Sequence, residues 1–546
     1  MAQNKMKTFS LEGGEDFVTP DLVIKDGMAR FAENFEQDYN TGYTKMAGFR
    51  NYLGSAALPG EGPILGLFMF DRTLRMYRKK VGLNEIDLFQ LFKAVWNTDG
   101  TEQTPGSWLA GTVVLDYLGA PTTLTYSDRA ILQTVQHNFK AVGSTTTSSL
   151  DEPYIDSDYN FGKIYGADGV NPAFEFNGFN LQQIKSTYTP DIPRHIEANG
   201  NRLALGFRAG EIAMSVLGDP TDFSAVSGAG SIGVTDSLTG MSASPDGSMY
   251  IFTKNKSYIF YGMSGPLANA ELKKYSKDVG CLPYTNQTLG DKSLMWDKYG
   301  LTTIDAVERF GDIASNSISN KVQYRFDTMY PRCSTVIGSK AQYRVYLVPN
   351  VNDHDPIAPT QALLATMIRG GSLGITHATF PFTVGVCSYG TVFWDGTETA
   401  DVHVVGTTAG DVYEMDAGTS YDGVAYTSTL VLPFTHAGSP GYAKKFRKID
   451  INVDAAEETT IQFAAEFSFG RTGDSREVVL APSGALWGTK SWGDFVWGGG
   501  TVGHLESYIN GHGENMSLTI TSTGDDVPQY TLKDISITYQ MQRINR

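Results

Sequence analysis

Short apolar segments return at a nearly constant interval through the middle of this chain, and this repeat restricts the fold more than any other feature. The segments RLALGF, MYIF, LMW, YRVYLV and TVFW begin at residues 202, 249, 294, 343 and 391, in steps of 47, 45, 49 and 48. Polar turns and a second apolar segment follow several of them, as at Tyr258–Tyr261. A period in the forties filled with short strands is typical of β-propeller blades. The repeat predicts about five to seven blades, with an irregular meander of hairpins as the alternative.

The composition fits a chain of short strands and tight turns. Aromatic residues make up 12% of the 546 residues and charged residues only 19%, and there are 59 glycines. Aromatic side chains favour pleated surfaces, and glycine supplies the positive φ angles that tight turns need. We therefore expect an all-β protein. One segment, Asn84–Trp96, has apolar residues at roughly helical spacing and is expected to form either a short helix or a pair of strands.

Changes in pattern divide the chain into three parts. Residues 1–60 are polar, glycine-containing and irregular, and are predicted to be a lead-in or assembly segment. The predicted propeller occupies 61–436, with 121–190 as a candidate insertion. After the turn-rich sequence AGSPG, side chains alternate between apolar and polar, as in 461–469. Such alternation indicates strands with one buried face, and it predicts an antiparallel, sandwich-like C-terminal domain over 437–546.

The charge balance argues against a surface that grips nucleic acid. The formal net charge is −16 and the pI is about 5.0. No run of Lys and Arg stands out as a phosphate-binding face, which sequence-independent DNA binding would require. An acidic surface keeps most proteins soluble, and it would also suit a conduit through which DNA passes without sticking.

The cysteines and the apolar runs indicate a protein made in a reducing compartment. Cys281, Cys333 and Cys387 are widely spaced, which predicts neither a disulfide framework nor a zinc site. The first residues contain no apolar leader, and no apolar run reaches the length of a membrane span.

Motifs for nucleotide binding and hydrolysis are weak or missing. Gly228–Gly233 matches GxGxxG, but neither a buried strand before it nor a helical pattern after it is evident, so a flexible connection between blades is the favoured interpretation. The sequence contains no GxxxxGK[ST], HExxH or GxSxG motif. Asp246 lies in the turn signal SPDG and is expected to close a turn rather than bind calcium.

Histidines and tryptophans near the C-terminus are the remaining candidates for a site. His504 and His512 lie close in sequence to Glu506 and Glu514, which suggests a metal site, although exposed loop histidines are the favoured interpretation. Three tryptophans in Trp487–Trp497 indicate either packing within the domain or an exposed contact surface. With 59 carboxylates, an acid/base pair remains open, but none is singled out. We therefore predict no catalytic residue, no cofactor and no metal ligand.

Several segments, in their order along the chain, resemble the propeller-bearing hub or nozzle proteins of short-tailed phages, also called packaged-DNA stabilisation proteins. The most specific is Gly410–Asp422 (GDVYEMDAGTSYD), which follows the family pattern G-x-V-Y-x-x-D-x-G-x-x-x-D. Looser matches lie at 42–49, 201–206, 215–223, 239–262, 300–301, 310–312, 318–319 and 534–539, and in the Trp-rich segment. The segment 215–223 ends in Phe223 where the family usually has Trp, and residues 121–190 match nothing in the pattern.

The resemblance implies a non-enzymatic structural protein of the virion, made in the host cytoplasm. It implies a homohexameric ring below the portal and the tail adaptor, with fibres or spikes attached outside and genomic double-stranded DNA passing through without sequence-specific binding. Six such copies would carry a charge of about −96 and repel phosphates. The alternatives are a receptor- or glycan-binding propeller tail protein, with hydrolase activity as an option, and a baseplate-type minor tail protein or cellular scaffold propeller.

Overall fold

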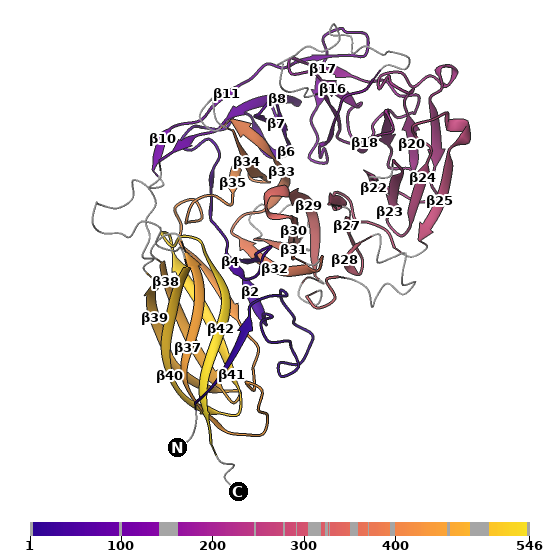
Figure 1. Ribbon diagram of the computed structural model, residues 1–546. Helices are drawn as coiled ribbons and strands as arrows, with labels where there is room; N and C mark the ends of the chain where they lie inside the picture. The colour runs from indigo at the N-terminus through magenta and orange to yellow at the C-terminus, as the bar shows by residue number, and fades with distance from the viewer. Residues whose placement is uncertain are drawn as a thin grey trace.

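A computed structural model describes most of the chain as strands, with a ring of sheets joined to an elongated sandwich (Figure 1). The described residues are 4–97, 101–140, 162–244, 247–276, 279–290, 292–303, 318–322, 326, 328–349, 359–369, 371–393, 399–455, 459–480 and 502–542. Single-turn 3-10 helices lie at Ala225–Ser227, Leu267–Asn269 and Gly338–Lys340. The all-β prediction is confirmed.

Seven sheets of the described residues follow one another around a ring and form the propeller. The first contains β6 (Glu61–Phe70), β7 (Thr73–Lys79), β8 (Glu85–Phe92), β11 (Ser107–Leu109) and β13 (Leu124–Thr125). The second contains β14 (Gln133–His137), β15 (Lys163–Ala167), β16 (Phe174–Phe176), β17 (Asn180–Gln183) and β12 (Val113–Leu115). The third contains β18 (His195–Asn199), β19 (Arg202–Gly206), β20 (Glu211–Met214) and β21 (Gly230–Gly233). A two-stranded ribbon, β9 (Val95–Trp96) and β10 (Glu102–Thr104), lies beside the first sheet.

The next four sheets complete the ring. The fourth contains β22 (Leu238–Ala243), β23 (Met249–Thr253), β24 (Ser257–Tyr261) and β25 (Glu271–Ser276), and the fifth contains β26 (Gln287–Leu289), β27 (Lys292–Asp297) and β28 (Gly300–Thr303). The sixth contains β29 (Met329–Ile337), β30 (Gln342–Pro349), β31 (Thr360–Met367) and β32 (Leu373–Phe380). The seventh contains β33 (Val384–Phe393), β34 (Thr399–Thr407), β35 (Val412–Met415) and β5 (Phe49–Asn51).

The ring is closed by an early strand rather than by consecutive hairpins alone. First strands of neighbouring sheets contact one another, as where Leu132 N donates to Leu65 O at 2.9 Å and Asn286 Nδ2 donates to Met241 O at 2.7 Å. The seventh sheet takes its last strand, β5, from the N-terminal segment, where Phe49 pairs with Met415. The last blade therefore contains residues separated by more than three hundred positions.

The sandwich consists of two sheets that enclose one apolar core. One sheet contains β1 (Asn4–Ser10), β3 (Phe35–Gln37), β4 (Tyr43–Lys45), β42 (Tyr530–Met541), β37 (Lys444–Ala455) and β40 (Val502–Gly513). The other contains β36 (Tyr426–Val431), β41 (Met516–Gly524), β38 (Thr459–Phe467) and β39 (Arg471–Leu480). The alternating apolar residues of Ile461–Phe467 point into this core, as their pattern predicts.

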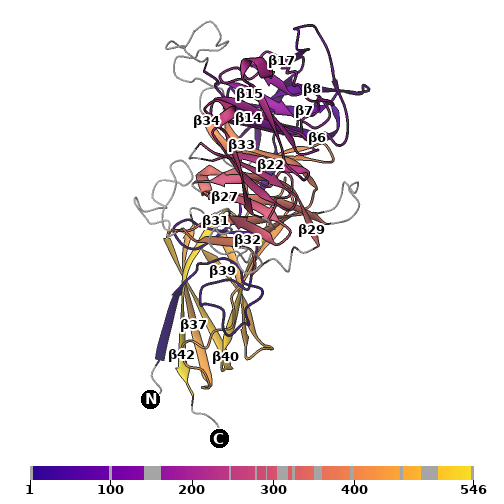
Figure 2. The ribbon, with the colours of Figure 1, turned by 90° about the vertical axis from the view of Figure 1, so that its right-hand side faces the viewer.

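Propeller and sandwich share a single nine-stranded sheet. The short strand β2 (Phe31–Glu33) pairs with β32 of the sixth blade on one side and with β36 of the sandwich on the other. The strand order is β29-β30-β31-β32-β2-β36-β41-β38-β39, so main-chain hydrogen bonding runs from one domain into the other. Figure 2 shows the sandwich directly below the propeller blades.

Two predicted boundaries differ from the structure. Residues 1–60 are not an irregular lead-in, because β1 pairs along β42 over seven residues and β2 to β5 enter the sheets of both domains. The sandwich does not begin at residue 437 either, because β36 (Tyr426–Val431) already belongs to it. Both segments are joined to their sheets by long-range backbone pairing, which leaves no local signal in the sequence.

Three other predictions can be placed on the strands. Residues 84–96 form the strands β8 and β9, because their apolar side chains lie on a pleated surface rather than on a helix. The described part of 121–190 is not an insertion but supplies β13 to β17 of the first two blades. Four of the repeat segments lie on the second strand of a blade, whereas the described residues of the fifth, 391–393, end the first strand of the seventh blade, β33. The segment Trp487–Trp497 lies outside the described residues.

Candidate functional site

The outer face of the six-stranded sandwich sheet gathers most of the charged and polar groups that sequence analysis considered. On β40, Leu505, Ser507 and Ile509 point into the core, while the residues between them are exposed. The exposed series is His504, Glu506, Tyr508, Asn510 and His512. Because side chains alternate across a strand, all five lie on one face. The loop histidines expected from the sequence are therefore strand residues.

A β-bulge concentrates positive charge on this face. In the pairing of β37 with β42, Phe446 lies opposite Tyr539 and Lys448 lies opposite Thr538, so Arg447 is an extra residue. Without the bulge, Arg447 and Lys448 would point to opposite faces. With it, Phe446 is fully buried while Lys445, Arg447 and Lys448 all keep access to solvent.

The bulge borders an open hollow of about 470 Å³. It is lined by Asn4, Lys445, Arg447, Tyr508, Ile509, Asn510 and Gln540. A row of hydrogen bonds crosses three strands here: Arg447 Nη2 donates to Gln540 Oε1 at 3.0 Å, and Gln540 Nε2 donates to Asn4 Oδ1 at 2.7 Å. The side chain of Tyr508 stands 63% exposed beside this row.

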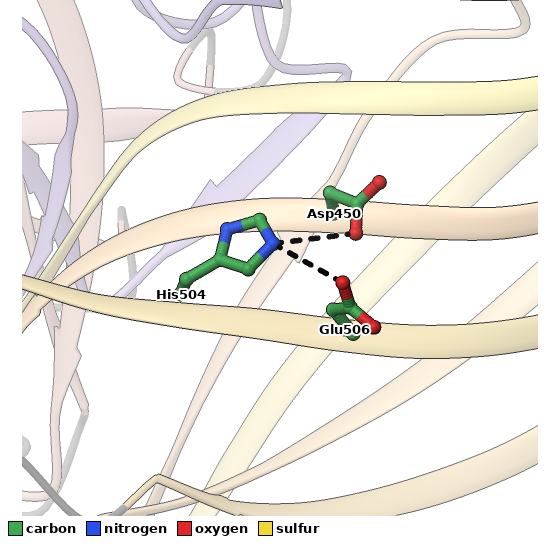
Figure 3. A group of neighbouring side chains, drawn as sticks. All are labelled: Asp450, His504 and Glu506. Carbon is green, nitrogen blue, oxygen red and sulfur yellow. Dashed lines mark ion pairs between the residues drawn. The ribbon is translucent and has the colours of Figure 1, made fainter.

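The neighbouring half of the same face is acidic, and its carboxylates contact the ammonium group of Lys448. His504 Nε2 lies 3.5 Å from Asp450 Oδ1 and 3.6 Å from Glu506 Oε1, so these three side chains could offer ligands to a metal ion (Figure 3). The Lys448 ammonium forms an ion pair with Asp450, 2.8 Å from its Oδ1, and donates a hydrogen bond to Glu506. This contact raises the pKa of Lys448 and lowers the pKa of Glu506. Lys448 thus compensates part of the charge of the two carboxylates, and the group is an ion-pair cluster in the described structure.

The other residues considered as candidate metal ligands are not brought to this cluster. His512 Nδ1 lies 3.2 Å from Gln542 Oε1, and the backbone oxygen of Glu514 accepts a hydrogen bond from Lys444 Nζ at 2.7 Å. His504 and His512 are eight residues apart on one strand. Because a strand rises about 3.4 Å per residue, the two histidines lie at separate points along it.

The remaining motif residues have structural positions. Gly230–Gly233 is the outer strand β21 of the third blade, so the GxGxxG match is neither a dinucleotide loop nor the flexible connection that we expected. Cys281 and Cys333 are buried free thiols, and Cys387 is a half-buried one. Burial raises the pKa of Cys281 to about 12, so its reactive thiolate is scarce at neutral pH. Asp246 lies outside the described residues.

Sequence analysis missed the basic part of this site. The segment Lys444–Lys448 reads KKFRK, four cations in five residues, whereas we expected no Lys/Arg run of note. Lys444 is fully buried and donates to the backbone oxygens of Ser439 and Tyr442, so only three of the four cations reach the face. The run itself was the available signal; the bulge that gathers it is visible only in the strand pairing.

Comparisons with known proteins find only distant structural likenesses. No family model and no curated protein matches the chain. Among solved structures, it is similar to virginiamycin B lyase from Staphylococcus aureus (8% identity, TM-score 0.34), YCF48 bound to D1 peptide (12%, 0.33) and BBS1N in complex with ARL6DN (8%, 0.27). Each alignment covers 68% of this chain and 99%, 97% and 97% of those structures, respectively. These are β-propeller proteins of varied function, and likenesses this distant say nothing about what the present chain does.

The described residues contain no helix with the length and apolar character needed to span a bilayer.

Proposed function

We propose that this chain is a structural phage tail protein of the hub or nozzle type, which forms a homo-oligomeric ring around the path of DNA ejection. The observation that carries the proposal is the nine-stranded sheet that continues from the sixth propeller blade into the sandwich. A ring subunit must transmit force between partners without bending at a linker. Two domains that share one sheet satisfy this need, because bending between them would break main-chain hydrogen bonds.

A buried contact between a histidine and a carboxylate fastens the N-terminal segment to this sheet. His377 Nδ1 on β32 lies 2.8 Å from Glu15 Oε1, and both side chains are fully buried. The carboxylate of Glu15 also accepts the backbone N–H of Ala32 in β2. Close packing adds to this contact, because a Cβ atom at Gly14 would lie 2.4 Å from Ile375 N. The N-terminal segment therefore reaches the sheet at a site that only glycine fits.

A second buried cluster joins the sixth and seventh blades to β3. The Arg344 guanidinium is fully buried, 3.2 Å from Asp416 and 3.7 Å from Glu36, and Lys340 Nζ lies 2.7 Å from Glu36. Burial alone would lower the pKa of Arg344, but the two carboxylates raise it. Burial lowers the pKa of His403 to about 4, so the histidine at this site is neutral at pH 7. Two cations and two carboxylates therefore balance one another inside the junction.

The overall charge suits a path for DNA. With a net charge of −16 per chain, a ring of copies repels phosphates, and the duplex slides rather than binds. Under this proposal the partners are further copies of the chain, a tail adaptor and fibres or spikes, and the protein belongs to the virion. The resemblance of Gly410–Asp422 and the other segments to tail hub proteins supports the same assignment.

The test is electron microscopy of the purified chain together with native mass spectrometry, with and without its cognate tail adaptor. We expect a symmetric ring of about six copies whose channel admits a DNA duplex, about 20 Å across. A chain that stays monomeric at high concentration, and that also fails to assemble on the adaptor, would overturn the proposal. A ring whose channel is narrower than a duplex in every state would do so as well.

A further inference from the structure

We propose that the hollow around Arg447 and Tyr508 on the sandwich binds an anionic saccharide, one that carries a carboxylate on a sugar ring. This site lies outside the propeller, and it does not depend on the assembly proposed above. The argument rests on three features of the hollow: its uncompensated positive charge, its exposed aromatic ring and its row of amides.

The first feature is positive charge without a partner. Within the described part of the chain, the charged groups of Lys445 and Arg447 form no ion pair, and the Arg447 guanidinium donates to the neutral amide of Gln540. Lys448 differs, because Asp450 and Glu506 neutralise it. In a chain with a net charge of −16, a hollow lined by two free cations and no carboxylate is unusual. It favours a ligand with negative charge.

The second feature is the exposed ring of Tyr508. It lines the same hollow and is 63% exposed. An aromatic ring in this position offers an apolar plane with a polar tip. The C–H face of a pyranose ring is the complementary surface, whereas a bare inorganic anion has none. The ring therefore favours a ligand that has a flat face as well as a charge.

The third feature is the set of amides around the ring. Asn4, Asn510 and Gln540 come from three different strands and all line the hollow. Each amide has both donors and acceptors, which is what neighbouring hydroxyl groups need. The Gln540 amide is held between Arg447 and Asn4 by hydrogen bonds of 3.0 and 2.7 Å, so its orientation is fixed in advance. The hollow of about 470 Å³ is in the range of small-ligand sites.

The experiment measures binding by isothermal titration calorimetry to the full chain at physiological salt. The probes are tetragalacturonate, the neutral tetrasaccharide maltotetraose, inorganic phosphate and hexaglutamate. The test variants are Arg447→Gln and Tyr508→Ala, both at exposed positions. The matched controls are Arg208→Gln, between β19 and β20, and Tyr330→Ala on β29, which are exposed residues of the propeller. Circular dichroism checks that every variant folds.

We expect saturable binding of tetragalacturonate that falls at least tenfold in Arg447→Gln and in Tyr508→Ala and is unchanged in both controls. Binding of maltotetraose should be at least tenfold weaker than that of the acidic sugar. Absence of tetragalacturonate binding would overturn the proposal. Phosphate or hexaglutamate binding as tightly as the sugar, with no effect of Tyr508→Ala, would overturn it too and identify a simple anion site or a peptide site instead.

Discussion

At the scale of single residues, the most consequential groups are charges buried where the N-terminal segment meets the two domains. Lys45 on β4 is 1% exposed, and its Nζ donates to Val527 O at 2.9 Å and contacts Tyr426 Oη. Both acceptors are neutral. Burial lowers the pKa of this lysine from 10.5 to about 7. Arg344 and Asp416 are the contrasting case, because each of these buried charges faces its opposite.

The lowered pKa of Lys45 predicts a free energy of unfolding that increases with pH. Between pH 7 and 10.5 the unfolded chain holds a proton on Lys45 that the folded chain has lost. The free energy of unfolding therefore increases with pH across this window, by at most ~1.4 kcal/mol per pH unit. Urea unfolding of the wild type and of Lys45→Met at pH 7, 8 and 9 measures this. At each pH step, we expect the free energy of unfolding of the wild type to increase relative to that of the variant. An equal pH dependence of the two proteins would show that Lys45 stays charged in the folded chain.

Removing one partner of the buried cluster should cost more than removing the pair. Asp416→Asn leaves the Arg344 guanidinium without its closest carboxylate, and we expect a loss of about 3–5 kcal/mol in the free energy of unfolding. In the double variant Arg344→Met with Asp416→Leu, both members of this ion pair are gone and neither is left buried without a partner. Most of the lost free energy of unfolding should therefore be recovered. Denaturant titration of the three proteins compares them. Equal losses in the single and double variants would contradict an electrostatic cause.

At the scale of elements, short strands from the N-terminal segment complete sheets that the rest of the chain leaves open. β5 supplies the last strand of the seventh blade, and β1 extends the sandwich along β42. Phe49 on β5 is 3% exposed, and its ring lies 4.9 Å from those of Phe382 and Tyr413. Packing of this one ring thus joins the start of the chain to the end of the propeller.

Phe49→Ala should open the ring at its closing blade. Truncation of a buried phenylalanine typically costs about 3–5 kcal/mol, because contacts are lost and a cavity remains. Phe179→Ala is the matched control, since Phe179 is 60% exposed and its loss should change stability by less than about 0.5 kcal/mol. Thermal unfolding and hydrogen exchange of β33 to β35 report the effect. An unchanged exchange rate in these strands would mean that β5 is not what closes the blade.

At the scale of the whole molecule, the nine-stranded sheet makes the propeller and the sandwich mechanically continuous. The connection depends on β2, only three residues long, with Ala32 paired to Leu430. The same residue donates its N–H to the buried Glu15 carboxylate. A chain built in this way should unfold as one body.

We expect a single calorimetric unfolding transition for the intact chain and two for Ala32→Pro. Proline removes the N–H that Glu15 accepts and disturbs the shared sheet, and a buried acceptor left without its donor costs about 1–3 kcal/mol. Ala57→Pro, at an exposed position before the propeller, is the control. Two transitions already present in the wild type would show that the domains unfold independently despite the shared sheet.

The fold class and its repeating unit could be predicted from the amino-acid sequence alone. Regular spacing of apolar segments predicts blades, and alternation at Ile461–Phe467 predicts a sandwich strand, because both depend on which faces of a local segment must be buried. Three features could be seen only in the folded chain. Strand β1 pairs with β42, and β2 joins the two domains. The bulge at Arg447 places the exposed cations of KKFRK beside Tyr508. These features arise from backbone hydrogen bonds between distant strands, and a backbone donor or acceptor is the same in nearly every residue, so the local sequence carries no record of its partner.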